Sequence, residues 1–286
     1  MKISDAHTDF LTEIKDKTER EKYVRQISAV ADTISCAIYT SNSTISVQDV
    51  ENFKLEIEEY NKKYHTNLLL SIEDLGFVKN TTDLTRLIQL KPVSVTLTWN
   101  DKNQFAGGAN SKCGLTKYGR KVVKLLEENN ILIDTAHLSR RAFWDFQKIT
   151  TKPIYNSHSN VNALFRHKRN LTTAQVKAVV KSNGYLGITL YEKFVSNNEI
   201  SCRDVALQFN YLIKKFGCKN FGLGTDLFGI EKQFLPTDFK SYFDIKNLFN
   251  ELNNLGYSNK EIKLILQNNL KNFLKKLNSH NSSYWL

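Results

Sequence analysis

Several histidines and carboxylates in this sequence stand where a short apolar segment ends. In Asp5-Ala6-His7-Thr8-Asp9, the i, i+2 spacing would point His7 and Asp9 to the same side of an extended chain. Glu73, in Leu70-Ser71-Ile72-Glu73-Asp74, ends a second segment of this kind. Three further side chains that could bind a metal or move a proton have the same placement: His137, His158 and Asp226. We treat these positions as one candidate set.

The residue types of this set suit a divalent metal. Imidazole nitrogen and carboxylate oxygen are usual zinc ligands, and a shared carboxylate can hold two ions about 3.5–4 Å apart to activate a water for hydrolysis. Manganese or cobalt would also accept such ligands. A single histidine is more often structural, so the indication rests on the joint occurrence. The remaining histidines lie in helical or loop contexts and are left out of the set: His65, His167 and His280.

The elements that could position the set alternate along the whole chain. Short β-rich segments are separated by longer segments of helical period, such as 116–129 and 203–216, a pattern typical of parallel strands joined by crossover helices. Eight strand-helix units without a Ser/Gly-rich break favour one closed (β/α)8 TIM barrel over two domains, although a doubly wound open sheet would show the same alternation. The predicted strands cover residues 2–7, 33–39, 67–73, 93–99, 131–136, 153–157, 184–190 and 220–226.

The barrel interpretation gives the candidate set a common location. In (β/α)8 barrels the carboxyl ends of the strands and the loops after them form the active face, and every member of the set falls there. A length of 286 residues exceeds the roughly 150 residues of an average domain but suits one barrel. We expect one domain over residues 1–286, with a C-terminal helix at about 260–277.

Composition argues against several other classes of protein. The formal net charge is +11, but basic pairs such as Arg140-Arg141 and Lys275-Lys276 are scattered among helical segments, so a nucleic-acid-binding surface is not indicated. The four cysteines lie far apart without a C-x-x-C pair, which disfavours a thiolate zinc site and a disulfide framework. No stretch approaches the roughly 18 apolar residues of a membrane span. We expect a cytoplasmic protein that binds neither nucleic acid nor a membrane.

Ordered motifs around these residues resemble the renal or membrane dipeptidase family of zinc peptidases. Between residue 5 and about residue 230 they are D-A-H-T-D, S-I-E, L-T-W-N, G-L-T-K-Y-G-R-K-V-V, I-D-T-A-H-L-S, N-S-H-S-N, H-K-R-N-L-T and G-L-G-T-D-L-F-G-I. The resemblance implies the barrel, a binuclear zinc centre and a metallo-dipeptidase that cleaves dipeptides with loose selectivity, sometimes with a D-residue on the C-terminal side. Members of the family often form dimers, so a homodimer is a further expectation.

The resemblance also assigns a role to each metal ligand in the set. His7 and Asp9 would bind one zinc ion, His137 and His158 would bind the other, and Glu73 would bridge the two and so take part in catalysis. A bridging hydroxide would attack the scissile carbonyl of a dipeptide, and the metals would stabilise the oxyanion.

Proton transfer and substrate binding fall to other residues. The resemblance makes Asp226 the proton shuttle and makes Arg169, in H-K-R-N, the residue that holds the substrate carboxylate. Trp99 and Tyr191, at the ends of the fourth and seventh predicted strands, are the other expected substrate contacts. Trp99 stands where mammalian members have the histidine of L-T-H, and Phe228 replaces the second acid of the family pattern S-D-F-D-G, so the pocket is expected to differ from theirs.

Two other functions stay open on the sequence alone. Another barrel metallohydrolase, such as a lactonase, an amidase or a metal-dependent deoxyribonuclease, can use the same ligand types at strand ends. A non-catalytic descendant that only binds peptides or metal is the second alternative, motivated by Trp99 and Phe228. The ordered motifs and the complete ligand set favour the dipeptidase.

Overall fold

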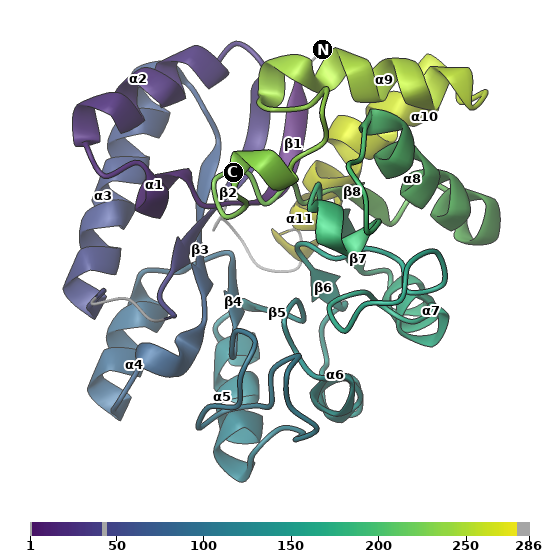
Figure 1. Cartoon of the computed structure of the whole chain (residues 1–286). Coiled ribbons are helices and arrows are strands. Elements are labelled where there is room, and N and C mark those ends of the chain that lie inside the picture. The colour runs from purple at the N-terminus through teal and green to yellow at the C-terminus, as the bar shows by residue number, and fades with distance from the viewer. Residues whose placement is uncertain (1, 42–44, 279–286) are drawn as a thin grey trace.

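The computed structural model describes residues 2–41 and 45–278, and its centre is a closed barrel of parallel strands (Figure 1). Each strand pairs with the next one in the sequence, and β8 pairs with β1 through Asp5 and Leu223 to close the ring. The strands are β1 (Ile3–Thr8), β2 (Ala31–Tyr39), β3 (Leu68–Glu73), β4 (Ser94–Thr96), β5 (Leu132–Asp134), β6 (Tyr155–Asn156), β7 (Tyr185–Ile188) and β8 (Phe221–Leu223). The predicted (β/α)8 fold is confirmed.

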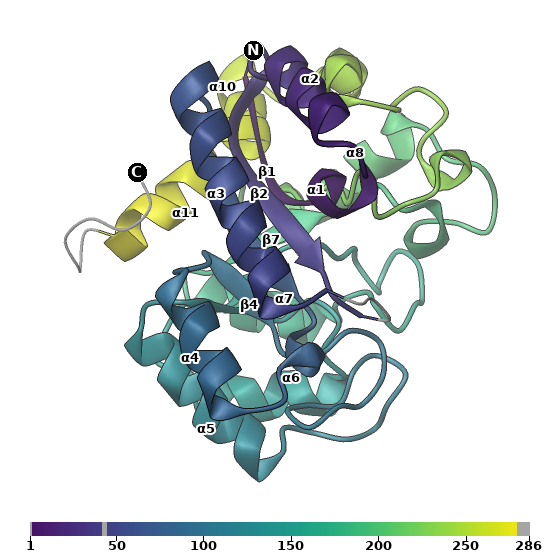
Figure 2. The ribbon, with the colours of Figure 1, turned by 90° about the vertical axis from the view of Figure 1, so that its left-hand side faces the viewer.

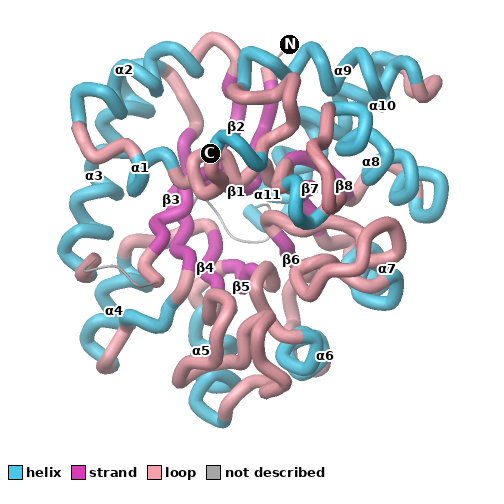
Figure 3. The backbone as a smooth tube through the Cα atoms, in the orientation of Figure 1, coloured by secondary structure: helices cyan, strands magenta, loops and turns pink. Residues whose placement is uncertain are grey.

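Helices surround the barrel, and loops connect them to the strand ends, as Figure 3 shows by colour. The α-helices are α1 (Phe10–Glu13), α2 (Lys17–Ile27), α3 (Val47–Tyr64), α4 (Thr81–Gln89), α5 (Lys117–Glu128), α6 (Arg140–Gln147), α7 (Thr173–Lys181), α8 (Cys202–Phe216), α9 (Ile245–Asn254), α10 (Asn259–Lys263) and α11 (Asn269–Asn278). Shorter helical turns are η1 (Leu75–Phe77), η2 (Glu192–Phe194), η3 (Lys232–Phe234), η4 (Tyr242–Asp244) and the π-helical η5 (Leu264–Asn268).

Local sequence signals explain where several helices begin. Ser46 and Asp49 form a capping box at α3, and the pairs Thr172/Gln175, Ser201/Asp204 and Ser258/Glu261 do the same at α7, α8 and α10. Each pair satisfies backbone N–H groups that have no partner inside the helix. The predicted helices 116–129 and 203–216 correspond to α5 and α8, although their apolar residues Leu125 and Leu207 are exposed. The predicted C-terminal helix corresponds to α10, η5 and α11 in succession.

The predicted strands are all present, but four are much shorter than predicted. Segments 93–99, 131–136, 153–157 and 220–226 contain only β4, β5, β6 and β8. Polar side chains take over the backbone bonds there: the N–H of Ser157, for example, donates to Asp134 Oδ1 at 2.9 Å. The chain leaves the sheet early at these positions because the residues after the strands build the loops of the active face.

The amino end of the barrel is closed by α11, which lies opposite the long loops in Figure 2. Phe273 of α11 packs its ring against Tyr155 and Tyr185, with ring centroids 5.7 and 5.9 Å apart. The two tyrosine hydroxyls donate to the carbonyls of Ala6 and Leu223, so they are buried without loss of their hydrogen bonds. This apolar layer fills the barrel below the candidate site.

Two glycines allow the strands beneath the site to approach closely. A Cβ at Gly187 in β7 would lie 1.9 Å from the carbonyl oxygen of Ser157, and a Cβ at Gly224 would lie 1.7 Å from the same atom. No side chain fits in either position. The carbonyl oxygen of Ser157 therefore lies directly against the backbones of Gly187 and Gly224.

Candidate metal centre

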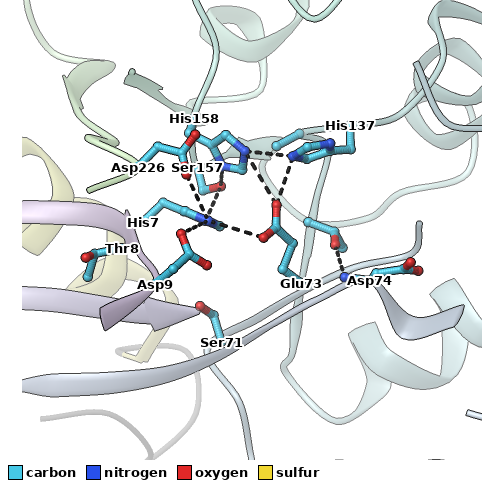
Figure 4. Close-up of polar contacts among 12 residues, drawn as sticks. His7, Thr8, Asp9, Ser71, Glu73, Asp74, His137, Ser157, His158 and Asp226 are labelled. Atoms are coloured by element: carbon cyan, nitrogen blue, oxygen red, sulfur yellow. Dashed lines mark hydrogen bonds and ion pairs between the residues drawn. The ribbon is translucent and has the colours of Figure 1, made fainter. Parts of the chain in front are cut away.

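The candidate ligands converge at the carboxyl end of the barrel, as predicted (Figure 4). His7 lies in β1 and Asp9 follows it, while Glu73 is the last residue of β3. His137, His158 and Asp226 stand in the loops after β5, β6 and β8. His137 and Asp226 have positive φ values of 66° and 62°, a conformation that costs non-glycine residues energy and is often found at functional sites.

Glu73 stands between two groups of nitrogen atoms. Its Oε1 lies 2.9 Å from His137 Nε2 and 3.7 Å from His158 Nε2. Its Oε2 lies 3.7 Å from His7 Nε2, which in turn is 3.4 Å from Asp9 Oδ2 and 3.9 Å from Asp226 Oδ1. The side chain thus presents one oxygen to each half of the centre.

The nitrogen and oxygen atoms that converge here are suited to bind divalent metal ions. His7 Nε2 and both carboxylate oxygens of Asp9 are buried and make no hydrogen bond within the described part of the chain. The Nε2 atoms of His137 and His158 face each other at 2.8 Å. Buried acceptors that converge without donors are costly in a protein interior, and cations bound between them would remove this cost.

Burial and neighbouring charges set the protonation of the imidazoles. Burial lowers the pKa of His137 to about 3, and the Arg169 guanidinium acts in the same direction. Burial also lowers the pKa of His158 well below its usual range, assisted by the charges of His7 and Arg169. Burial opposes a proton on His7 as well, but the carboxylates of Asp9 and Glu73 raise its pKa well above the usual range. The same negative charges would attract a metal ion.

The pKa values of two carboxylates in the candidate set, Asp226 and Glu73, are shifted in opposite directions. Burial raises the pKa of Asp226 well above its ordinary value, and the charges of Asp9 and Glu73 raise it further, against His7 and Arg169. Burial acts on Glu73 in the same way, but His7 and His137 bring its pKa well below the ordinary value. A carboxyl group with a raised pKa is suited to proton transfer, and one with a lowered pKa is suited to ligation.

A cavity of about 560 Å³ opens over the centre, and Arg169, Trp99 and Tyr191 line it together with Asp226. Arg169 is 5% exposed, and its Nη2 donates to the carbonyl of His158 at 3.2 Å. Burial lowers the pKa of this guanidinium to about 10, so it stays charged at neutral pH. Its Nε has no partner within the described part of the chain and remains available to a ligand.

Aromatic side chains form part of the cavity wall, and Trp99 is one of them. The Trp99 ring stacks on His137 at 5.7 Å, and Tyr39 meets Trp99 edge to face at 5.5 Å. Phe228 also lines the cavity and belongs to an aromatic group with Phe10 and Tyr23. Trp99 and Phe228 therefore both contribute apolar surface to the cavity wall.

The structure adds residues that the sequence analysis did not assign. His167, left out as a loop histidine, lines the cavity with its ring stacked on Phe194 at 4.6 Å. Asp5, inside the motif D-A-H-T-D, is no ligand: its carboxylate accepts bonds from Thr225 N at 2.8 Å and the Tyr242 hydroxyl at 2.6 Å. Its position two residues before His7 in the same strand is the sequence signal that could have suggested a structural role near the strand end. His280 lies outside the described residues.

The basic residues also gather more than the sequence suggested. A second cavity of about 730 Å³ shares His167 and Lys168 with the first. Among the residues that the structure describes, no acidic side chain lines it. Its other lining residues are mainly cationic: Lys112, Arg140, Arg141 and Arg166. The view that basic residues are only scattered is therefore wrong for this rim, which the fold assembles from the loops after β4 and β6 and the start of α6.

This combination of a closed barrel with histidine and carboxylate ligands at its carboxyl end defines the barrel metallohydrolases. Residues 10–284 match the model of the membrane dipeptidase family, peptidase family M19. The chain belongs to this family, and it is an enzyme of the metallo-dipeptidase class. The matched range begins after His7 and Asp9, so their assignment rests on the motif and on the geometry.

Individual proteins are also similar to this chain, and the solved structures among them show the same fold. An uncharacterized protein in the pqqA 5′ region of Klebsiella pneumoniae is 28% identical over 213 residues, which cover 70% of this chain and 78% of that protein. A metallo peptidase from Rhodobacter sphaeroides, solved with a phosphinate mimic of L-Ala-D-Ala, has a TM-score of 0.83, with 17% identity and coverage of 97% and 99%. An amidohydrolase from Pseudomonas aeruginosa has a TM-score of 0.81, with 17% identity and coverage of 96% of each chain.

Within the described residues, no helix is long and apolar enough to cross a membrane. The expected cytoplasmic location, the homodimer and the single domain over the whole chain stay predictions.

Proposed function

We propose that this protein is a binuclear zinc dipeptidase. The observation that carries the proposal is the placement of Glu73, whose Oε1 faces His137 and His158 while its Oε2 faces His7. A carboxylate shared by two ions needs this orientation. His7 and Asp9 would hold one ion and His137 and His158 the other, with zinc favoured by the ligand types.

The residues of the chain divide the reaction between them. Bound zinc ions would polarise the scissile carbonyl and acidify a water molecule. Asp226 would take a proton from that water as the C–O bond forms, and would pass it to the leaving nitrogen as the C–N bond breaks. The raised pKa of Asp226 suits both transfers, because the group can carry the proton near neutral pH.

Arg169 accounts for a preference for dipeptides. The guanidinium is buried beside the metal ligands, and the carbonyl of His158 and the ring of Phe194, 5.5 Å away, hold it there. A carboxylate bound by Arg169 would be the C-terminus of the substrate, one residue beyond the scissile bond. Trp99 and Tyr191 would contact the rest of the substrate from the cavity wall.

Metal analysis combined with a substrate panel tests the proposal. Purified protein should carry up to two zinc ions per chain, and chelation should abolish hydrolysis of Ala-Ala and L-Ala-D-Ala until zinc, manganese or cobalt is restored. The L-Ala-D-Ala substrate is included because the Rhodobacter sphaeroides neighbour binds its phosphinate mimic. Absence of bound metal, or turnover of a lactone or N-acyl amide in preference to every dipeptide, would overturn the dipeptidase assignment.

A further inference from the structure

The hydroxyl of Ser157 touches imidazoles from both halves of the centre. Ser157 is 1% exposed and stands between β6 and His158. Its Oγ lies 2.7 Å from His158 Nδ1 and 3.3 Å from His7 Nδ1 (Figure 4). The two rings themselves are close, with centroids 3.9 Å apart. One oxygen atom therefore meets a ligand of each proposed metal ion.

The protonation of a neutral imidazole determines which group donates in this contact. A neutral imidazole carries one proton, so a ring that donates Nδ1–H keeps its lone pair on Nε2. In both His7 and His158 the Nε2 atom is the one that faces Glu73. A hydroxyl oxygen has two lone pairs and can accept both Nδ1–H bonds. Ser157 thus selects the tautomer that aims each Nε2 at the metal centre.

The backbone that carries this hydroxyl is fixed by Asp134, a residue 2% exposed in the neighbouring strand β5. Asp134 Oδ1 accepts the backbone N–H groups of Ser157 and Ala136, each at 2.9 Å. Asp134 therefore holds the segment from which the Ser157 hydroxyl reaches both imidazoles. This is a second layer of contacts of the kind that tunes metal ligands.

We propose that Ser157 is a positioning residue that couples the two metal sites, acting through His7 and His158 and held by Asp134. The inference rests on the proposed binuclear centre. His137 differs, because its Nδ1 contacts Asn100 Oδ1 at 3.1 Å instead. Removal of the Ser157 hydroxyl should therefore affect both metal-binding steps, whereas removal of the Asn100 side chain should affect one.

Metal titration of Ser157→Ala tests this coupling. Competition with a chromophoric chelator should show both zinc dissociation constants raised by roughly 10- to 100-fold, the usual effect of losing an outer partner of a ligand. Cobalt-substituted Ser157→Ala should also show a changed visible absorption spectrum, because two ligand rings lose their orientation. Asn100→Ala should raise only one of the two constants. Circular dichroism of the metal-free proteins checks that each variant is folded.

Ser159→Ala is the matched control. Ser159 is fully buried on the same segment, and its hydroxyl has no hydrogen-bond partner within the described residues. Its removal should leave both zinc constants and the cobalt spectrum as in the unaltered protein. Ser157→Thr keeps the hydroxyl and adds no zinc ligand, so both constants should stay closer to those of the unaltered protein than in Ser157→Ala.

The outcomes separate this inference from the proposed function. Unaltered protein that binds no divalent metal would refute the binuclear centre itself. Unaltered protein that binds two ions would overturn the coupling role, while leaving the dipeptidase proposal intact, if folded Ser157→Ala changed neither constant or only one, or if Ser157→Thr weakened both constants as much as Ser157→Ala.

Discussion

The two ends of the barrel differ sharply although the same strands build both. At the amino end, Phe273 of α11 packs against Tyr155 and Tyr185 in a layer of aliphatic and aromatic side chains. At the carboxyl end, the strands terminate in histidines and carboxylates that converge without enough donors to satisfy one another. Tyr155 and His158 stand only three residues apart in the sequence, so the change from packing to chemistry occurs within one strand and its following turn.

The comparison shows how a barrel can stay folded although one end holds buried polar groups that lower its stability. Converging buried carboxylates and imidazoles destabilise the folded chain when no cation lies between them. The apolar layer at the other end contributes stability that does not depend on metal. Substitutions at the carboxyl end should therefore change catalysis with little effect on folding, and substitutions at the amino end should do the opposite.

The largest expected effect is that of Asp226→Asn at the carboxyl end. Loss of the proton shuttle should lower kcat by about 10²- to 10⁴-fold, while zinc content and thermal unfolding of the loaded protein stay near those of the unaltered protein. Steady-state kinetics with Ala-Ala, together with elemental analysis, measures both. A variant that has lost metal as well as activity would show that Asp226 is a ligand, which its 3.9 Å separation from His7 Nε2 makes a clear alternative.

Phe273→Ala at the amino end should change the free energy of unfolding by an amount similar to the change that Asp226→Asn makes in the activation free energy, and should leave activity unchanged. Removing a buried aromatic ring costs about 3–5 kcal/mol of unfolding free energy, and kcat should stay within about twofold because the site is built at the far end. Urea unfolding and kinetics on the same preparation make the measurement. Phe243→Ala, at a ring that is 50% exposed, is the matched control and should cost under about 0.5 kcal/mol. Equal losses of activity and stability in Phe273→Ala would break the comparison.

Arg169→Ala should give a smaller and substrate-dependent loss. A charge-assisted hydrogen bond is worth about 1.5–3 kcal/mol, so kcat/KM for free dipeptides should fall roughly 10- to 150-fold. C-terminally amidated dipeptides lack the carboxylate, and the substitution should change their already poor cleavage little. Kinetics with Ala-Ala and its amide test this. Equal losses on the two substrates would mean that Arg169 supports the site in another way.

The smallest expected effect concerns the basic rim of the catalytic end. The cavity lined by Arg140, Arg141 and Arg166 should favour a substrate with an acidic side chain. Changing these three residues to Gln should lower the kcat/KM ratio of Ala-Glu to Ala-Gln by about two- to fivefold at low ionic strength, as exposed charges contribute little each.

Salt and charge-matched variants check this last prediction. High salt should remove the difference between the altered and unaltered proteins, because it screens exposed charges. Changing three exposed lysines elsewhere to Gln removes the same charge and should leave the substrate ratio unchanged: Lys62, Lys214 and Lys246. A ratio that falls equally with both sets of substitutions would assign the effect to net charge rather than to the rim.

The alternation of strands and helices, the fold class and the candidate ligands could be predicted from the sequence, because each depends on short-range signals. Period-2 and helical patterns mark the elements, and the H-x-D pattern of His7 and Asp9 and the acid of Glu73 stand directly at strand ends. Strand length was less predictable. β6 has two residues because the Asp134 side chain captures the N–H of Ser157, a contact between residues far apart in the chain.

The sequence by itself determined which residues could ligate and that strand ends would gather them. Only the tertiary structure decided how they are oriented: that each oxygen of Glu73 faces a different group of nitrogens, that one serine hydroxyl meets two imidazoles, and that His167 lines the cavity. The physical reason is the sequence separation over which each kind of interaction acts. Patterning depends on neighbours a few residues apart, whereas the direction of a hydrogen bond depends on the register and close approach of strands, which Gly187 and Gly224 permit under Ser157.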